Sequence, residues 1–394
     1  MYNKEMAMHS VPPEFQLNND GLTLLWSSQQ AVTYPWFWLR DHGEDQDSLD
    51  AATLQRKVDT FAVPHDIKAN AVQWHGEILQ LQWSDGSTSH ISLQRLKQIA
   101  GLAPESEALP DADRRYYWLA DNLPDPYPSF AYTELIASEM AVWQWLSAIV
   151  RYGFAVVTDV PSSEAATQTL AERIAPAQQT IFGIYWPLSA ELKDHGDTAY
   201  STQFLAPHTD GTYYHDAAGL QMFNCLEFDG KGGESVVVDG FAIAEHMRLK
   251  TPDLYQILTE ISVPGHYLEP GVHLYAERPV FRLDRHGQLA QISFNNYDRA
   301  PFLLAAERMQ AFYKAYAEFN RHAINQANWL KIPLRPGMAL IFDNWRCLHG
   351  RMGYVGKRFF YGCYHGHADF ESRLRVLAQT HAGAALGAVM SGYR

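Results

Sequence analysis

Cysteine, positive charge and long apolar runs are all scarce in this sequence of 394 residues. Its three cysteines, Cys225, Cys347 and Cys363, do not make a disulfide framework, and their apolar or aromatic neighbours predict buried free thiols. Acidic residues outnumber basic ones by 44 to 31, and the net charge of −13 argues against nucleic acid and anionic membranes as partners. No apolar run approaches the roughly 18 residues of a membrane span, and the first residues lack the apolar segment of a secretory signal. We therefore expect a cytoplasmic protein with no membrane or nucleic-acid partner.

The chain does contain ample apolar material for a sizeable core, because 47% of its residues are hydrophobic and 13% are aromatic. This length allows one large domain or two ordinary ones. Nearly alternating apolar residues at 22–26, 71–74 and 78–83 predict strands, so residues 1–100 are expected to form a small β-rich domain. Proline and acidic residues favour a linker at 101–125, which leaves 126–394 as the second domain.

The second domain is expected to be mainly β with flanking helices. Short apolar runs bounded by turn residues predict strands at 155–157, 220–228, 235–238, 291–294, 338–342 and 358–364. Helical spacing predicts helices at 131–151, 165–174, 241–249 and 305–327. Many short strands with few helices favour a sandwich or jelly roll, whose barrel mouth is the expected ligand site.

The segment His208-Thr209-Asp210 is the strongest candidate for a metal site. In a strand, side chains two positions apart point to the same face, so His208 and Asp210 are expected to bind one cation together. A further histidine, His349, would complete the two-histidine, one-carboxylate triad that leaves coordination positions open on Fe(II).

The spacing His-x-Asp is weak evidence alone, because it also occurs at His195-Gly196-Asp197 and His367-Ala368-Asp369. An isolated copy is usually an ordinary surface histidine beside an acid. Only the copy at His208 is followed by a long strand-rich region that then supplies another histidine, and we therefore prefer it.

An arginine and a group of aromatic residues accompany this candidate site. In the strand 358–364, Arg358 shares a face with Phe360, Gly362 and Tyr364, and a guanidinium suits a carboxylate ligand. The alternative is an arginine that extends into solvent from a strand end. The stretch 180–200 concentrates rings that suit a quaternary ammonium group, although these residues alone favour core packing.

Taken together, these residues resemble the gamma-butyrobetaine and trimethyllysine dioxygenases. These enzymes are the iron- and 2-oxoglutarate-dependent hydroxylases of carnitine biosynthesis. Of the two, the chain resembles trimethyllysine dioxygenase more. The resemblance runs through most of residues 20–375. Its matching segments are 170–174, 196–200, 208–210, 212–213, 232–233, 238–241, 295–300, 343–351 and 362–364. It implies a double-stranded β-helix (jelly-roll) catalytic domain with an appended N-terminal β domain.

The resemblance also implies a role for each matching residue. His208, Asp210 and His349 would bind Fe(II), and Arg358 would bind the far carboxylate of 2-oxoglutarate, with O2 as the other cosubstrate. The residues implied to enclose the trimethylammonium group are Phe182, Trp186, Tyr200 and Tyr364. Those implied to hold the polar end of the substrate are Asp197, Asn295 and Asn296.

The substrate that this pattern favours is N6,N6,N6-trimethyllysine, hydroxylated at C3. The gamma-butyrobetaine enzymes usually have an asparagine where this chain has Asp197, and an acid there suits the α-ammonium that trimethyllysine has and butyrobetaine lacks. The alternatives are a hydroxylase of gamma-butyrobetaine or another betaine, and a non-catalytic protein that binds quaternary ammonium compounds. An intact triad with Arg358 argues against a mere binding protein.

Two departures from the family pattern stand out. Phe182 replaces the usual tyrosine of the aromatic cage. The residues Trp38-Leu39-Arg40-Asp41 are followed by no cysteine before Cys225, where the family often has a zinc site, so we expect no structural zinc. The segment 380–394 has no family counterpart, and the assembly, a homodimer or a monomer, is left open.

Overall fold

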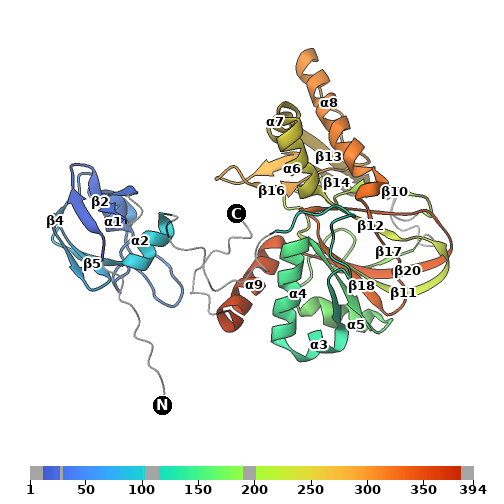
Figure 1. The fold of residues 1–394 in the computed structure, drawn as a ribbon, viewed down its shortest axis with the longest axis horizontal. Helices are drawn as coiled ribbons and strands as arrows, with labels where there is room; N and C mark the ends of the chain where they lie inside the picture. The colour runs from blue at the N-terminus through green and yellow to red at the C-terminus, as the bar shows by residue number, and fades with distance from the viewer. Residues whose placement is uncertain (1–11, 27–29, 101, 103–114, 190–200, 383–394) are drawn as a thin grey trace. The chain divides into compact units, whose positions relative to one another are not determined.

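The computed structural model describes residues 12–26, 30–100, 102, 115–189 and 201–382. The chain forms two compact units, Met1–Glu107 and Ala108–Arg394 (Figure 1). The expected division into 1–100, a linker at 101–125 and 126–394 stays a proposal, which limited proteolysis tests by cleavage within 101–125. In the described part of the chain, no helix is long and apolar enough to cross a membrane.

The N-terminal unit is β-rich, as expected. It contains two three-stranded antiparallel sheets, in the orders β1-β2-β3 and β4-β5-β6. The strands are β1 (Glu14–Leu17), β2 (Gly21–Leu25), β3 (Ala31–Pro35), β4 (Ala69–His75), β5 (Ile78–Trp83) and β6 (Thr88–Ser92), with helices α1 (Trp36–Asp41) and α2 (Leu93–Ile99) and the 3-10 turn η1 (Thr60–Ala62). In β5 the alternation places Leu79, Leu81 and Trp83 in the core and leaves Ile78 and Gln82 exposed.

Two sheets form the centre of the second unit. The larger has the order β7-β8-β18-β11-β20-β9 and the smaller the order β10-β19-β12-β17. Their strands are β7 (Ser129–Ala131), β8 (Phe154–Thr158), β9 (Tyr185–Leu188), β10 (Leu205–His208), β11 (Leu220–Gly232), β12 (Ser235–Asp239), β17 (Leu330–Ile332), β18 (Met338–Asp343), β19 (Cys347–Arg351) and β20 (Tyr354–His365). Phe342 and Phe360 of the larger sheet share a buried cluster with Val237 and Cys347 of the smaller one, so the sheets pack face to face. The jelly-roll prediction is confirmed.

Helices cover this sandwich in two groups (Figure 1). The first group packs on the larger sheet through residues such as Trp145, Leu170 and Leu374. The second group packs against β12 through residues such as Phe241 and Phe319. The first group is α3 (Tyr132–Ala137), α4 (Glu139–Tyr152), α5 (Glu164–Glu172) and α9 (His367–His381). The second group is α6 (Gly240–Lys250), α7 (Pro252–Glu260) and α8 (Ala306–Ala323). The remaining elements of this unit are β13 (Ser262–Glu269), β14 (Val272–Pro279), β15 (Phe281–Leu283), β16 (Leu289–Ile292) and the 3-10 turn η4 (Gln326–Asn328).

The helix predicted at 131–151 is wrong in one respect, because it is two helices. Ser138 lies between α3 and α4 with an extended backbone, φ −135° and ψ 123°. Its hydroxyl accepts a hydrogen bond from the backbone N–H of Ala141, so the residue caps a new helix instead of continuing the old one. The second helix, α4, ends at Gly153, which adopts the left-handed conformation with φ 80°.

A fully buried ion pair joins four segments of the second unit. Arg346 donates to both carboxylate oxygens of Asp239, at 2.7 and 3.1 Å, and both side chains are buried. The guanidinium also donates to the backbone carbonyls of Val150, Arg151 and Tyr116. Asp239 in turn accepts backbone hydrogen bonds from Trp118, Phe241 and Ala242. The pair therefore links residues 116–118, the end of α4, the junction of β12 and α6, and the residue that precedes β19.

A second buried network surrounds His367 at the start of α9. Its Nε2 lies 3.7 Å from Asp343 and its Nδ1 lies 3.1 Å from Glu371, while its ring stacks on Trp345 with centroids 4.1 Å apart. Burial lowers the pKa of His367, but the hydrogen bonds and charges of Asp343 and Glu371 prevail and raise it from 6.5 to about 9. The imidazole is therefore cationic at neutral pH.

This network predicts that stability falls as the pH rises above neutrality. Because the pKa of His367 is higher in the folded chain, its contribution is complete below about pH 6.5 and is lost as the pH rises through about 9. The loss amounts to at most about 3 kcal/mol. Denaturant unfolding at pH 6.5 and 9.5 measures this loss of stability. In His367→Asn, the free energy of unfolding should differ less between the two pH values. An equally steep slope in His367→Asn would contradict the assignment.

Candidate active site

His208 and His349 face each other across two antiparallel strands. They are register partners at the end of β10 and in the middle of β19, and their ring centroids are 4.4 Å apart. The strands approach closely at Gly350, where a Cβ would lie 2.5 Å from the carbonyl oxygen of Leu205. The ladder between these strands therefore sets the spacing of the two imidazoles.

Asp210 reaches the histidines from outside the strand. The expectation that one extended strand carries both His208 and Asp210 is wrong, because β10 ends at His208 and Asp210 follows in a bend. The side chain of Asn344 replaces the missing strand partner. It accepts from the N–H of Asp210 at 2.8 Å and donates to the carbonyl oxygens of Asp210 and Ala218 at 3.0 and 2.9 Å.

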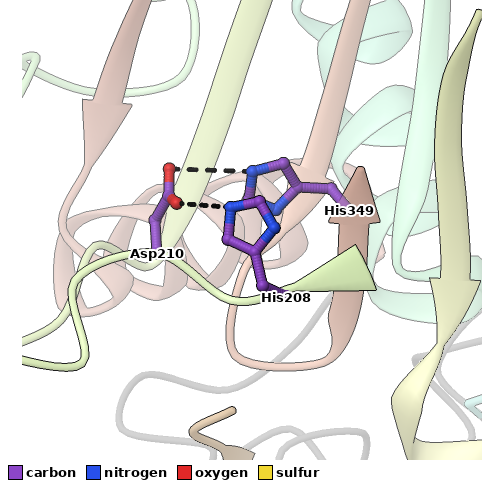
Figure 2. Close-up of side chains that lie close together, drawn as sticks. All are labelled: His208, Asp210 and His349. Carbon is purple, nitrogen blue, oxygen red and sulfur yellow. Dashed lines mark ion pairs between the residues drawn. The ribbon is translucent and has the colours of Figure 1, made fainter. Parts of the chain in front are cut away.

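The three side chains converge on one point (Figure 2). The Oδ1 atom of Asp210 lies 3.2 Å from Nε2 of His208, and its Oδ2 lies 3.7 Å from Nε2 of His349. Burial raises the pKa of Asp210, but the charges of both imidazoles and the hydrogen bond from His208 lower it well below its usual range. Burial and the neighbouring charge of His208 lower the pKa of His349 to about 3. The site therefore combines an ionised carboxylate with a neutral imidazole, which are the forms that bind metals.

The hydrogen bonding of His208 indicates which of its two nitrogens can bind a metal. Nδ1 of His208 lies 2.8 Å from the carbonyl oxygen of Ala206, which only accepts, so Nδ1 carries a proton. The other nitrogen, Nε2, faces Asp210 and would bind a metal after releasing the proton that it shares with the carboxylate. One ligand atom from each residue lies within 4.8 Å of the others. Two imidazole nitrogens and one carboxylate suit Fe(II) and leave positions for small ligands. The residues therefore fit the metal that the sequence predicts.

Of the two alternative His-x-Asp segments, only the one at His367 belongs to the described residues, and it lies in another network. His195 and Asp197 lie outside the described residues. His367 belongs to the network with Asp343 and Glu371. Among the residues that the structure describes, His208, Asp210 and His349 form the only cluster of three such donors.

The triad opens into a pocket that encloses about 850 Å3 of space, part of which is open to solvent. Arg358 lines it, with its guanidinium 3.7 Å from the ring centroid of Phe360, on the expected face of β20. Burial and the charge of Arg351 lower the pKa of Arg358 to about 9, so it remains cationic at neutral pH. A buried guanidinium in a pocket with a metal site favours an anionic ligand such as a carboxylate.

Arg358→Ala is expected to raise the KM for 2-oxoglutarate steeply. The variant leaves a buried carboxylate without its partner, at a cost of about 2 to 5 kcal/mol. Initial rates at varied 2-oxoglutarate measure the effect, and the KM of the primary substrate should change little. Arg335→Ala is the control, because Arg335 lies over Phe228 outside the pocket lining. An unchanged KM in Arg358→Ala would move the anchor to Arg351, since Arg373 pairs with Glu139.

Aromatic rings form another wall of the pocket. Phe182, Trp186 and Tyr364 line it, and the rings of Trp186 and Tyr364 are 5.1 Å apart with an interplanar angle of 45°. Tyr213 and Tyr297, which the sequence did not single out, line it too. Tyr200 lies outside the described residues. Three of the four predicted cage residues are thus brought to the pocket that contains the metal donors.

The polar end of the pocket differs in part from the expectation. Asn295 lines the pocket and donates to Oδ2 of Asp298 at 2.7 Å, whereas Asn296 is exposed and its side chain contacts Arg299. Asp298 also lines the pocket and had no predicted role. Asp197 lies outside the described residues. Sequence reasoning had a signal for Asp298, because it belongs to the matched segment 295–300.

Comparison with known proteins assigns this fold and site to a family. Residues 120–364 match the family described as taurine catabolism dioxygenase TauD, TfdA family. The chain belongs to this family of dioxygenases. Residues 14–96 match a second family, described as gamma-butyrobetaine hydroxylase-like, N-terminal.

Individual relatives extend over nearly the whole chain. The mitochondrial trimethyllysine dioxygenase of Gallus gallus is 32% identical and covers 94% of this chain and 89% of its own. The trimethyllysine dioxygenase of Meyerozyma guilliermondii and the gamma-butyrobetaine dioxygenase of a Pseudomonas species are each 30% identical, each covering 91% of this chain and 94% of their own. The resemblance predicted from the sequence is confirmed, and the protein is a dioxygenase whose described residues include a cluster of three metal donors.

Proposed function

We propose that the protein hydroxylates N6,N6,N6-trimethyllysine at C3, the first step of carnitine biosynthesis. The observation that carries this proposal is one pocket lined by the three metal donors, a buried guanidinium and several aromatic rings. Relatives named trimethyllysine dioxygenases match over nine-tenths of the chain and support the same substrate.

Each part of the pocket has a task in this reaction. His208, Asp210 and His349 would bind Fe(II), which with 2-oxoglutarate and O2 supplies the hydroxylation of an unactivated C–H bond. Arg358 would bind the far carboxylate of 2-oxoglutarate and so orient that cosubstrate. The rings of Trp186 and Tyr364 would bind the trimethylammonium group. Since this group has no N–H donor, ring faces are the partners that recognise it.

The two ends of the substrate together select the carbon that reacts. With the trimethylammonium group fixed at one end and the α-amino acid group at the other, only one stretch of the carbon chain can face the metal. We assign the α-ammonium to the acid Asp197, with Asn295 at the same end. The protein's contribution is therefore to position the substrate, while the metal and its cosubstrates supply the oxidation.

A hydroxylase of gamma-butyrobetaine is the alternative, because a gamma-butyrobetaine dioxygenase has the same 30% identity to this chain as one of the trimethyllysine dioxygenases. The two substrates share the trimethylammonium group but differ in the α-ammonium. A non-catalytic binding protein is disfavoured, since binding alone requires neither the donor triad nor Arg358.

A substrate screen tests the proposal directly. Succinate release is measured with trimethyllysine, butyrobetaine, dimethyllysine and lysine, and we expect the highest kcat/KM for trimethyllysine. Asp197→Asn keeps the size of the side chain but loses the charge, and a charged hydrogen bond contributes about 1.5 to 3 kcal/mol. The preference for trimethyllysine over butyrobetaine should therefore fall about 10- to 150-fold.

The control for this variant is Asp253→Asn, which removes an exposed acid from the first turn of α7 and should leave the preference unchanged. A wild type that prefers butyrobetaine would make the trimethyllysine assignment wrong. A ratio untouched by Asp197→Asn would have the same consequence.

Three further expectations remain proposals. We propose that the N-terminal unit holds no structural zinc, and metal analysis of the purified protein tests this. A cytoplasmic location and a homodimer are also proposed, and cell fractionation and light scattering test them.

A further inference from the structure

The metal-binding carboxylate receives two hydrogen bonds on the same oxygen. The hydroxyl of Tyr364 donates to Oδ2 of Asp210 at 2.8 Å, and Nε2 of Gln221 donates to it at 2.9 Å. Gln221 and Tyr364 are register partners on β11 and β20, two adjacent strands of the larger sheet. One rung of this ladder therefore presents both donors side by side.

These donors fix the rotation of the carboxylate. Oδ2 is occupied by the phenol and the amide, whereas Oδ1 faces Nε2 of His208 at 3.2 Å. Asn344 fixes the backbone of the same residue through its N–H and its carbonyl. With main chain and side chain both held, Asp210 offers one oxygen to a cation in a set direction.

The orientation of the Gln221 amide supports this reading. Its Oε1 is buried without a hydrogen-bond partner, so the amide gives up one interaction in order to direct its NH2 group toward Asp210. A flipped amide would bring its oxygen against the carboxylate, and two acceptors repel each other. The charge on Asp210 therefore decides the orientation.

Tyr364 has a second contact that Gln221 lacks. Its ring packs against Trp186 and forms part of the aromatic wall of the pocket. Because a phenol is rigid, any shift of the Tyr364 ring also moves the hydroxyl group that donates a hydrogen bond to Asp210. The same side chain thus contacts the proposed trimethylammonium site and the metal ligand.

We propose that Tyr364 is a positioning residue that, together with Gln221, sets the metal affinity of Asp210, and that Tyr364 alone couples this affinity to the substrate. The second half rests on the proposed function, because it requires a quaternary ammonium ligand against the Tyr364 ring. The first half concerns the metal alone and holds whichever substrate binds.

The first test is a titration with Co(II), followed by its visible absorption, with no substrate or cosubstrate present. Tyr364→Phe keeps the ring and removes one donor, and Gln221→Leu removes the other. Each variant should weaken Co(II) binding about 10- to 100-fold, the usual effect of losing a partner of a metal ligand. Tyr361→Phe is the matched control for the metal titration, since it removes a hydroxyl from the same strand that contacts Gln168, and it should keep the wild-type Co(II) affinity. Trp186→Leu tests the aromatic wall instead, and it should lower kcat/KM for trimethyllysine about 5- to 30-fold.

The second test measures how trimethyllysine changes the Co(II) dissociation constant. We expect the two ligands to affect each other in wild type and in Gln221→Leu, and the coupling factor to fall toward one in Tyr364→Phe. Melting temperatures identify any variant that is unfolded, and the other variant then decides the first test.

Different outcomes overturn different parts of the proposal. Unchanged Co(II) affinity in Tyr364→Phe or in Gln221→Leu overturns the positioning role of that residue. Coupling that persists in Tyr364→Phe, or is absent from wild type, overturns the substrate link. If trimethyllysine is not a substrate at all, the Co(II) titration still stands, so failure of the proposed function remains distinguishable.

Discussion

His208→Ala is expected to abolish turnover and to weaken metal binding by more than the 10- to 100-fold that loss of an outer partner costs. The variant removes one of three donors whose ligand atoms lie within 4.8 Å of one another. The remaining Asp210 and His349 supply only two of the three ligand atoms, so the position that His208 fills is lost. Product formation and a metal titration measure the two effects, and the melting temperature without metal should change little.

The control for this experiment is His195→Ala, which alters a histidine of the same His-x-Asp spacing outside the described residues. It should keep metal binding and activity. If His195→Ala loses the metal and His208→Ala retains it, the metal ligand is His195 and the assignment to His208 is wrong.

Arg346→Met is expected to destabilise the protein by about 3 to 5 kcal/mol, because it leaves the buried carboxylate of Asp239 without its charged partner. Three backbone carbonyls, those of Tyr116, Val150 and Arg151, lose their donor as well. Urea unfolding measures the loss. The double variant with Asp239→Leu should recover part of it, since no unpaired charge then stays buried.

An exposed pair on α6 provides the matched control. Arg248 donates to both carboxylate oxygens of Glu245, with the same two-point geometry as Arg346 and Asp239. Because this pair lies in water, Arg248→Met should change the stability little. Equal losses in Arg346→Met and Arg248→Met would mean that burial is not what makes the Arg346 pair important.

The strands and the histidines of the site were predictable because their signals are local. Alternation along β5 and the apolar runs of β8, β12 and β18 follow from which faces are buried. His349 was found because it follows a strand-rich region that begins after His208. The hairpin of β13 and β14 was missed, since its polar exposed face and its proline hide the pattern of a strand.

The residues that orient Asp210 could not be found in this way. Gln221 appears as an ordinary member of an apolar strand, and Asn344 lies 134 positions away from the residue that it holds. Their roles depend on which strands become neighbours, and no local pattern specifies this. Asp210 itself was identified from its spacing, but for a reason that the bend after β10 contradicts.

The long-range construction of the Asp210 site has a thermodynamic consequence. Because Asn344 and the ladder between β10 and β19 assemble the donors only in the folded chain, the unfolded chain offers the metal no comparable site. The free energy of unfolding therefore depends on the concentration of the metal. A free metal concentration of about 100 times the Kd adds about 2.7 kcal/mol to it. Preparations that differ in metal loading should consequently melt at different temperatures, and a chelator should bring them to one common value.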